Sequence, residues 1–343
     1  QENLKGIFTK IRGLMGSEAP AVPAEEHFPV NRSGQLSTPI GSADKHVEIA
    51  IISGKGGTGK TTVVSSLAQL AENKILADND VDAADLHLLL APQTVEGHDY
   101  MGGAKALIDS EKCASCGLCE TLCHFDAISM DGPGNGAVAI TYQVNDLACE
   151  GCGLCAIACP ANAVIQQPTV IGRWYVSDTE YGPMAHAKLG IAEDNSGRLV
   201  SQVRQRAAEL ARELKKELIL GDGPPGTGCP VIASVSGTDM ILIVTEPTVS
   251  GVHDMERVLQ LAAHFGIPAR VIINKADLNP DQAEKINSMA NNAGSAVIGT
   301  IPFDRHVHDA LMSGKTAIEY GQGPAAKAIR QIWTSLQHEI KEL

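Results

Sequence analysis

The sequence predicts an α/β fold with a mostly parallel sheet, interrupted by a small inserted α+β domain. Short apolar runs, each ended by a polar residue or glycine, alternate with stretches of helical periodicity. Between about residues 108 and 167 cysteine repeats and glycine turns replace this alternation. A length of 343 residues is enough for two domains that each bury a core. The predicted strands are Val47–Ser53, Lys74–Asp78, Leu218–Asp222, Met240–Thr245, Ala269–Asn274 and Ala296–Ile301.

The composition excludes several classes of protein. With 27 Lys and Arg against 40 Asp and Glu the net charge is −13, whereas nucleic-acid binding needs a basic face, so no nucleic-acid partner is expected. The longest apolar runs fall well short of the roughly 20 residues that cross a bilayer. The first residues lack the apolar core of a secretory signal, which predicts a cytoplasmic protein.

The two ends of the chain have simple patterns. Residues 1–16 place apolar side chains opposite Lys5, Lys10 and Arg12, which predicts a basic amphipathic helix or a frayed terminus. Such a helix could contact a partner or a membrane surface. Residues 17–44 carry four prolines and predict a tether, so 1–45 form one segment. The last stretch, Ala325–Leu343, predicts a helix packed on the core.

A phosphate-binding motif follows the first predicted strand. Residues 54–61 match G-x-x-x-x-G-K-T between a strand and a helix, where backbone N–H groups and the helix N-terminus surround a polyphosphate. Lys60 would contact the β- and γ-phosphates, and Thr61 would bind Mg²⁺. The motif predicts a P-loop NTPase domain built from residues 46–107 and 168–343. Its loop residues are Gly54, Lys55, Gly56, Gly57, Thr58, Gly59, Lys60, Thr61 and Thr62.

The extra lysine at Lys55 makes this segment resemble the MinD/ParA family of P-loop ATPases. The resemblance implies that ATP lies between two chains, as a homodimer or a heterodimer with a related ATPase, and that Lys55 reaches the other chain's nucleotide. Asp78 and Asp80 match the family's Asp-x-Asp pair, in which the second carboxylate orients the attacking water. Lys55, Lys60 and Asp80 are therefore the predicted catalytic residues, although a strand-end acid such as Asp80 can also cap a helix.

The same resemblance assigns the metal and the switch. Asp222 ends an apolar strand and resembles the Walker B residue, which holds Mg²⁺ through its water shell. A glycine-proline loop, Gly223–Thr227, follows it, and the Gly226 N–H is placed to sense the γ-phosphate. Loss of that phosphate would release the loop, which makes it a candidate switch.

The base is predicted less directly. Asn274-Lys275-Ala276-Asp277 spells the N-K-x-D motif with which GTPases read guanine, whereas the family uses the asparagine for adenine. The family also passes the segment containing Pro302 along the adenine. Lys55 and the Asp78/Asp80 pair favour ATP over GTP.

Eight of the nine cysteines form two runs that are 36 residues apart. Each run is C-x₂-C-x₂-C-x₃-C, the spacing of bacterial ferredoxins with two [4Fe-4S] clusters, in which the fourth cysteine of each run serves the other cluster. Zinc is the alternative for cysteine pairs of this type. A disulfide scaffold is not expected in a chain of this length. The predicted ligand sets are Cys113, Cys116, Cys119 and Cys159, and Cys149, Cys152, Cys155 and Cys123.

The chain beyond residue 44 resembles MinD-superfamily ATPases that contain an inserted ferredoxin domain, here residues 108–167. Relatives have been linked to maturation of redox metalloproteins. The ninth cysteine, Cys229, follows Asp222 by seven residues, an offset at which nitrogenase iron protein carries a cluster ligand. Cys229 is therefore expected either to hold a transient metal at a dimer axis or to be a small buried hydrophobe.

Three functions agree with these observations. The first is an ATP-hydrolysing iron–sulfur protein whose dimer couples the nucleotide state to electron transfer or metal-cluster assembly in a partner metalloprotein. The second is a scaffold or carrier that delivers its own cluster. The third is a spatial organiser like MinD, in which residues 1–16 anchor the protein to a membrane and the clusters are structural.

Overall fold

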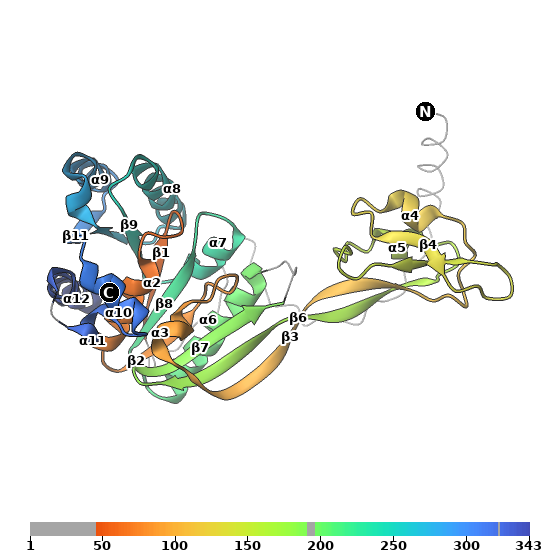
Figure 1. The fold of residues 1–343 in the computed structure, drawn as a ribbon, viewed down its shortest axis with the longest axis horizontal. Coiled ribbons are helices and arrows are strands. Elements are labelled where there is room, and N and C mark those ends of the chain that lie inside the picture. The colour runs from red at the N-terminus through yellow and green to blue at the C-terminus, as the bar shows by residue number, and fades with distance from the viewer. Residues whose placement is uncertain (1–45, 191–195, 322) are drawn as a thin grey trace. The chain divides into compact units, whose positions relative to one another are not determined.

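A nine-stranded sheet organises the described part of the chain, with the strand order β11-β10-β9-β1-β8-β2-β7-β6-β3 (Figure 1). The computed structural model describes residues 46–190, 196–321 and 323–343. These residues belong to one unit, Asp44–Leu343. The predicted amphipathic helix and tether, residues 1–45, lie outside the described residues.

All the predicted strands form. Five have the predicted bounds: β1 (Val47–Ser53), β2 (Lys74–Asp78), β9 (Met240–Thr245), β10 (Ala269–Asn274) and β11 (Ala296–Ile301). The sixth, β8 (Leu218–Pro225), continues past Asp222, because Pro225 still pairs with Ser53 across an irregularity in β1. A proline has no N–H to donate, and an irregular position is one of the few places where a strand accepts it. The prediction of a loop from residue 223 to 225 is therefore wrong.

Three further strands of the nine-stranded sheet were not predicted. They are β3 (Gln93–Ile108), β6 (Val164–Thr179) and β7 (Gly182–Leu189). β3 and β6, each of 16 residues, pair antiparallel along their whole length, and β7 joins them to β2. Much of this ribbon is exposed, so it lacks the continuous apolar runs that mark the buried strands. Pairing is parallel from β11 to β7 and antiparallel only at the β3 edge.

Helices cover both faces of the parallel part of the sheet. Ile49 and Ile51 of β1 face one helical layer, while Ala50 and Ile52 face the other. The first layer contains α2 (Lys60–Leu70), α3 (Leu86–Leu90), α10 (Arg305–Met312), α11 (Ala317–Tyr320) and α12 (Pro324–Lys341). The second contains α6 (Ser196–Glu213), α7 (Cys229–Val235), α8 (Val249–Phe265) and α9 (Pro280–Asn292). No helix within the described residues is long and apolar enough to cross a bilayer.

The cysteine-rich segment lies between β3 and β6. It contains α4 (Leu118–Leu122), α5 (Leu154–Ala158) and a two-stranded antiparallel sheet, β4 (Ile128–Gly132) and β5 (Thr141–Val144). Its cysteines share a small buried cluster with Ile128, Tyr142 and Val164. The domain bounds at 107/108 and 167/168 stay predictions, and both fall within or at the end of the ribbon strands.

The predicted C-terminal helix is α12, which buries Ile329, Ile332, Trp333 and Leu336. We expect Ile329→Ala to lower the free energy of unfolding by about 2–4 kcal/mol, because it removes most of a buried aliphatic side chain. The exposed Lys327 on the same helix provides the control, with a change below about 0.5 kcal/mol for Lys327→Ala. Urea denaturation followed by circular dichroism measures both variants, and equal midpoints would contradict the packing described here.

Candidate nucleotide site and cysteine cavities

The phosphate loop is shaped by glycines and held by β10. Gly57 and Gly59 have φ values of 79° and 90°, which side chains other than glycine rarely adopt. A Cβ on Gly59 would also lie 2.2 Å from Asn274 Nδ2, which donates a hydrogen bond to the Thr58 carbonyl at 2.7 Å. The first turn of α2 has no side-chain cap, so its N–H groups face the loop. The predicted anion-binding geometry is therefore present.

Lys60 lies among three buried carboxylates at the carboxyl ends of β2 and β8. Its Nζ is 2.5 Å from Asp222 Oδ1 and 3.5 Å from Asp80 Oδ2. Burial alone would lower the pKa of Lys60, but Asp222, Asp80 and Asp78 together raise it above its ordinary value. Lys60 is therefore a buried ammonium whose charge is balanced by this trio.

The carboxylates in turn have perturbed pKa values. Burial, followed by the charge of Asp222, raises the pKa of Asp78 well above its ordinary value. Burial also raises the pKa of Asp80 to about 6, although Lys60 acts in the opposite direction. Neighbouring carboxyl groups whose pKa values are raised by burial are typical of functional sites, and a bound cation would favour their ionised forms.

Several buried polar atoms at this site have no hydrogen-bond partner among the described residues. They include Thr58 Oγ1, Asp78 Oδ2 and both side-chain atoms of Asn79. A buried polar atom without a partner is costly, so such atoms indicate where a ligand or water completes the structure. The residues thus fit a Mg²⁺-nucleotide. Asn79 was not predicted, although its position inside the Asp78-Asn79-Asp80 triplet could have indicated it.

Lys55 makes contacts within its own chain. Its Nζ lies 2.7 Å from Glu246 Oε1 and 2.9 Å from Ser250 Oγ. Glu246 also pairs with Lys275 at 3.1 Å, and Lys275 reaches the Gly57 carbonyl at 3.4 Å. Burial opposes ionisation of Glu246, yet the two lysines lower its pKa. Sequence reasoning missed Glu246, and the predicted contact of Lys55 with a second chain stays a prediction.

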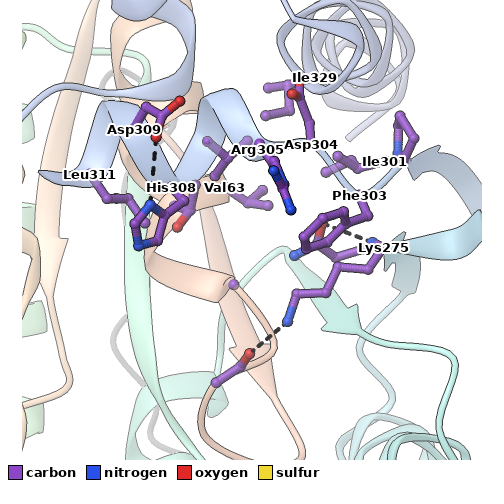
Figure 2. A pocket seen from close by; sticks show the side chains of 16 residues that line it. Val63, Lys275, Ile301, Phe303, Asp304, Arg305, His308, Asp309, Leu311 and Ile329 are labelled. Atoms are coloured by element: carbon purple, nitrogen blue, oxygen red, sulfur yellow. Dashed lines mark hydrogen bonds and ion pairs between the residues drawn. The ribbon is translucent and has the colours of Figure 1, made fainter. Parts of the chain in front are cut away.

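A cavity of about 770 Å³ extends from the phosphate loop toward α10. Figure 2 shows Lys275 and Phe303 on one side of it and His308 and Leu311 on the other. The predicted base residues Asn274 and Pro302 both line it. A cavity of this size, with both apolar and polar lining, accommodates a nucleotide base and ribose.

The N-K-x-D motif is not arranged as a guanine reader. The Asp277 carboxylate accepts a hydrogen bond from the Phe303 N–H at 2.6 Å, so one of its oxygens holds the segment that follows β11. Asn274 is likewise committed to the phosphate loop through its Nδ2. Both side chains therefore connect parts of the cavity wall.

The predicted switch loop is tied to its neighbours. The Gly226 N–H, predicted to sense a γ-phosphate, donates to the Ser53 carbonyl at 2.8 Å, and Arg257 holds Thr227 at 2.8 Å. Sensing would require the first of these bonds to break. Cys229 is the first residue of α7 and is exposed, so its interpretation as a buried hydrophobe is wrong.

The eight clustered cysteines line two separate cavities, and all nine cysteines are free thiols. Each cavity is lined by four cysteines. Three come from one run and the fourth comes from the other run, as the ferredoxin spacing predicts. The first cysteine cavity is lined by Cys113, Cys116, Cys119 and Cys159. The second cysteine cavity is lined by Cys123, Cys149, Cys152 and Cys155.

The backbone of this segment repeats with the same 36-residue offset as the cysteines. Ser115 and Gly151 both have positive φ, as do Gly117 and Gly153, and Asp126 and Asn162. Hydrogen bonds repeat as well, since the Asp109 N–H donates to the Ala163 carbonyl and the Asn145 N–H to the Ala127 carbonyl, both at 2.7 Å. The two runs are therefore copies of one structural unit.

Backbone N–H groups point at three of the cysteine sulfurs. Ala127, Ala163 and Ala106 donate to the Sγ atoms of Cys123, Cys159 and Cys149 at 3.4, 3.3 and 3.5 Å. Such bonds stabilise thiolates, the form that ligates metals. Among the described residues, no three His, Cys, Asp or Glu side chains are arranged around a point that would hold one metal ion.

The comparisons place the nucleotide site in a family. A family model described as the CobQ/CobB/MinD/ParA nucleotide binding domain matches residues 49–317. The chain belongs to this family. An uncharacterized protein of Methanocaldococcus jannaschii is 30% identical over 298 residues, which cover 86% of this chain and 98% of that protein.

Two further matches bear on fold and function. The solved structure of the septum site-determining protein MinD from Pyrococcus horikoshii, complexed with Mg-ADP, superposes with a TM-score of 0.50 at 19% identity, covering 85% of this chain and 96% of that one. This confirms the α/β fold of the MinD/ParA type. An iron-sulfur cluster carrier protein of Pyrococcus abyssi is 26% identical over 139 residues, which cover 37% of this chain and 47% of that protein.

The raised pKa of Asp80 makes a testable contribution to stability in this MinD/ParA-type protein. The folded-state pKa, about 6, lies above the ordinary 3.8, so the folded state disfavours the ionised carboxyl. This cost is absent below about pH 4, grows as the pH rises, and is complete above about pH 6. We therefore expect Asp80→Asn to melt at a higher temperature than wild type at pH 7, with the difference disappearing near pH 4.

The exposed Asp82 provides the matched control for this measurement. Differential scanning calorimetry without nucleotide should give Asp82→Asn a melting temperature close to that of wild type at pH 7, because Asp82 is exposed. An Asp80→Asn difference that is independent of pH would show that Asp80 is not the titrating group.

Proposed function

We propose that the chain is an ATP-binding and ATP-hydrolysing iron–sulfur protein that acts as a dimer and couples its nucleotide state to electron transfer or metal-cluster assembly in a partner metalloprotein. The observation that carries the proposal is the grouping of eight cysteines into two four-cysteine cavities within a chain that also has a MinD/ParA-type phosphate loop.

The two cysteine cavities are the argument for two [4Fe-4S] clusters. Each cavity offers four sulfurs, the number that one cube requires, and draws them from both runs in the ferredoxin manner. Backbone N–H groups already point at three of the sulfurs, and such bonds tune reduction potentials. Clusters of this kind supply single-electron transfer when bound.

At the nucleotide site different residues would bind the phosphates, bind Mg²⁺ and activate the attacking water. Lys60 and the first turn of α2 would hold the β- and γ-phosphates, and Thr61 and Asp222 would hold Mg²⁺. For this, Lys60 must exchange its contact with Asp222 for the phosphates. Asp80, whose pKa of about 6 is close to neutrality, is suited to orient and accept a proton from the attacking water.

A continuous row of paired residues supports coupling between the two sites. Asp222 on β8 pairs with Asp78 on β2, Asp78 with His186 on β7, and His186 with Tyr175 on β6. The Tyr175 and His186 rings stack with centroids 5.1 Å apart, and Ser177 holds His186 at 2.8 Å. Burial lowers the pKa of His186 to about 4, so it is neutral at physiological pH. The row leads from the nucleotide carboxylates to the ribbon whose other end, Ile108 with Val164, carries the cysteines.

Delivery of a cluster is the second candidate. The relative named as an iron-sulfur cluster carrier protein favours it, although that match covers only 37% of this chain. In this case the clusters would leave the protein rather than cycle between oxidation states, and the nucleotide would control release.

The proposal predicts about eight iron atoms per chain after anaerobic reconstitution. Cys159→Ser should disturb the same cluster as Cys113→Ser, although these cysteines lie in different runs, and Cys123→Ser should disturb the other. Electron paramagnetic resonance of the reduced protein distinguishes the two clusters. Mg-ATP should alter the spectrum or the reduction potential of wild type but not of Lys60→Ala, which keeps its iron and loses the phosphate contact.

Three outcomes separate the candidates. A protein without iron–sulfur clusters would contradict both. Clusters that pass to an apo-ferredoxin faster with ATP would support the carrier. Clusters that stay bound and cycle reversibly, with a spectrum and potential that ATP does not change, would contradict the proposed coupling to the nucleotide state.

A second prediction concerns the base. Because Asp277 holds the Phe303 backbone rather than facing the cavity as a guanine reader, we propose that the site prefers ATP to GTP and that Asp277 positions the wall against the adenine. Asp277→Ala should weaken ATP binding about three- to tenfold, the range expected for one lost hydrogen bond. Isothermal titration with ATP and GTP measures this, with the exposed Asp281→Ala as control. Preference of wild type for GTP would overturn the proposal.

A further inference from the structure

The two cysteine cavities are copies of one unit, so differences between their surroundings stand out. Ile157 on α5 is 84% exposed, whereas the equivalent residue of the other run is Thr121 on α4. Phe125 lines the second cysteine cavity and is 45% exposed, whereas Ala161 lines the first in the equivalent place. The repeat accepts Thr121 and Ala161 at the equivalent places, so the fold does not require apolar side chains at Ile157 and Phe125.

Leu154 is a further exposed apolar side chain, and its equivalent in the other run is Leu118. Leu154 lies one helical turn before Ile157 on α5, which puts the two side chains on neighbouring positions of one helix face, and it is 38% exposed. Cys152, two residues before Leu154, is itself exposed and lines the second cysteine cavity. We call Phe125, Leu154 and Ile157 the apolar rim. Exposed apolar side chains that lie close together, as Leu154 and Ile157 do on one helix face, are typical of protein interaction sites.

Charge also distinguishes the second cavity. Glu150 lines it, where Ala114 lines the first, and Asp126 stands in the place that Asn162 has beside the first. The whole segment from 109 to 163 is strongly acidic, with Lys112 as its single lysine or arginine. Its carboxylates are Asp109, Glu111, Glu120, Asp126, Asp131, Asp146 and Glu150. A partner for this surface therefore needs positive charge around an apolar centre.

We propose that the apolar rim is the docking site for a basic partner protein, one that presents apolar side chains surrounded by lysine or arginine. This rests on the proposed function, because it makes the cluster of the second cysteine cavity the one that exchanges electrons with the partner. Glu150 and Asp126 steer the partner, and Ile157 and Phe125 are the contacts that lose most water on binding. The first cavity then lies one step farther from the partner in the electron path.

The repeat itself supplies the variants for the test. Phe125→Ala and Ile157→Thr introduce the residues that the other copy of the repeat has at the equivalent positions, Ala161 and Thr121, so the double variant is expected to fold and to keep its clusters. Val95→Thr is the control, because Val95 is 67% exposed on β3 and away from the rim. Glu150→Gln with Asp126→Asn tests the charges.

The probe is cytochrome c, a small basic redox protein. Isothermal titration of oxidised full-length protein with oxidised cytochrome c gives the dissociation constant without any electron transfer. We expect the double rim variant to raise this constant at least about fivefold, as hot-spot residues do, and Val95→Thr to leave it unchanged. The charge variant should weaken binding and flatten its dependence on salt.

A kinetic measurement follows the electron. Protein reduced with dithionite and freed of excess reductant by anaerobic gel filtration is mixed with ferric cytochrome c, so that one electron leaves a reduced cluster and converts ferric haem iron to ferrous. The rim variant should slow this reaction at least about fivefold, while the reduction of ferricyanide, which needs no docking surface, stays unchanged.

The outcomes distinguish this inference from the proposed function. A preparation without iron–sulfur clusters contradicts the proposed function. Variants with full iron content that bind and reduce cytochrome c as wild type does overturn the docking site alone. Wild type that reduces ferricyanide but shows no affinity for cytochrome c overturns it as well.

Discussion

The contact between Lys60 and the carboxylates of Asp222 and Asp80 is the interaction on which the nucleotide site depends. Parallel strands bring their carboxyl ends to one edge, so Asp78 at the end of β2 and Asp222 near the end of β8 lie beside the loop that follows β1. A buried lysine beside buried acids is stable only when the charges are balanced. The site is therefore suited to an exchange of contacts, in which Lys60 would bind phosphate and the carboxylates would bind a cation.

Polar residues around this site hold neighbouring segments of the chain in place. Asn274 holds the phosphate loop, Asp277 holds the segment after β11, and Glu246 lies between Lys55 and Lys275. Each of these polar contacts fixes the wall of the cavity at a point where a nucleotide would bear on it. A γ-phosphate that took the Gly226 N–H would replace its bond to the Ser53 carbonyl, which is how nucleotide binding could move the loop after β8.

The insertion follows a different principle. It has a small buried cluster in which cysteines take part, and its backbone repeats with the period of the cysteine runs. So small a core would leave much of the stability to the proposed clusters, since metal binding contributes directly to folding in small metal-binding domains. It is connected to the sheet through the paired strands β3 and β6 and not through a flexible linker.

The sequence by itself determined the parallel sheet, the phosphate loop and the cysteine grouping, because each depends on local patterns: buried apolar runs, a short motif and a fixed spacing. It did not reveal β3 and β6, since an exposed antiparallel ribbon is held by cross-strand hydrogen bonds rather than by a run of apolar residues. It did not reveal β7 either, because the buried residues of that strand do not form a long apolar run. Only the tertiary structure decided that Glu246 pairs with Lys55, that Asp277 holds Phe303, and that Phe125 and Ile157 are exposed. These facts depend on residues far apart in the chain, or on which side of a fold a residue emerges, and no local pattern encodes either.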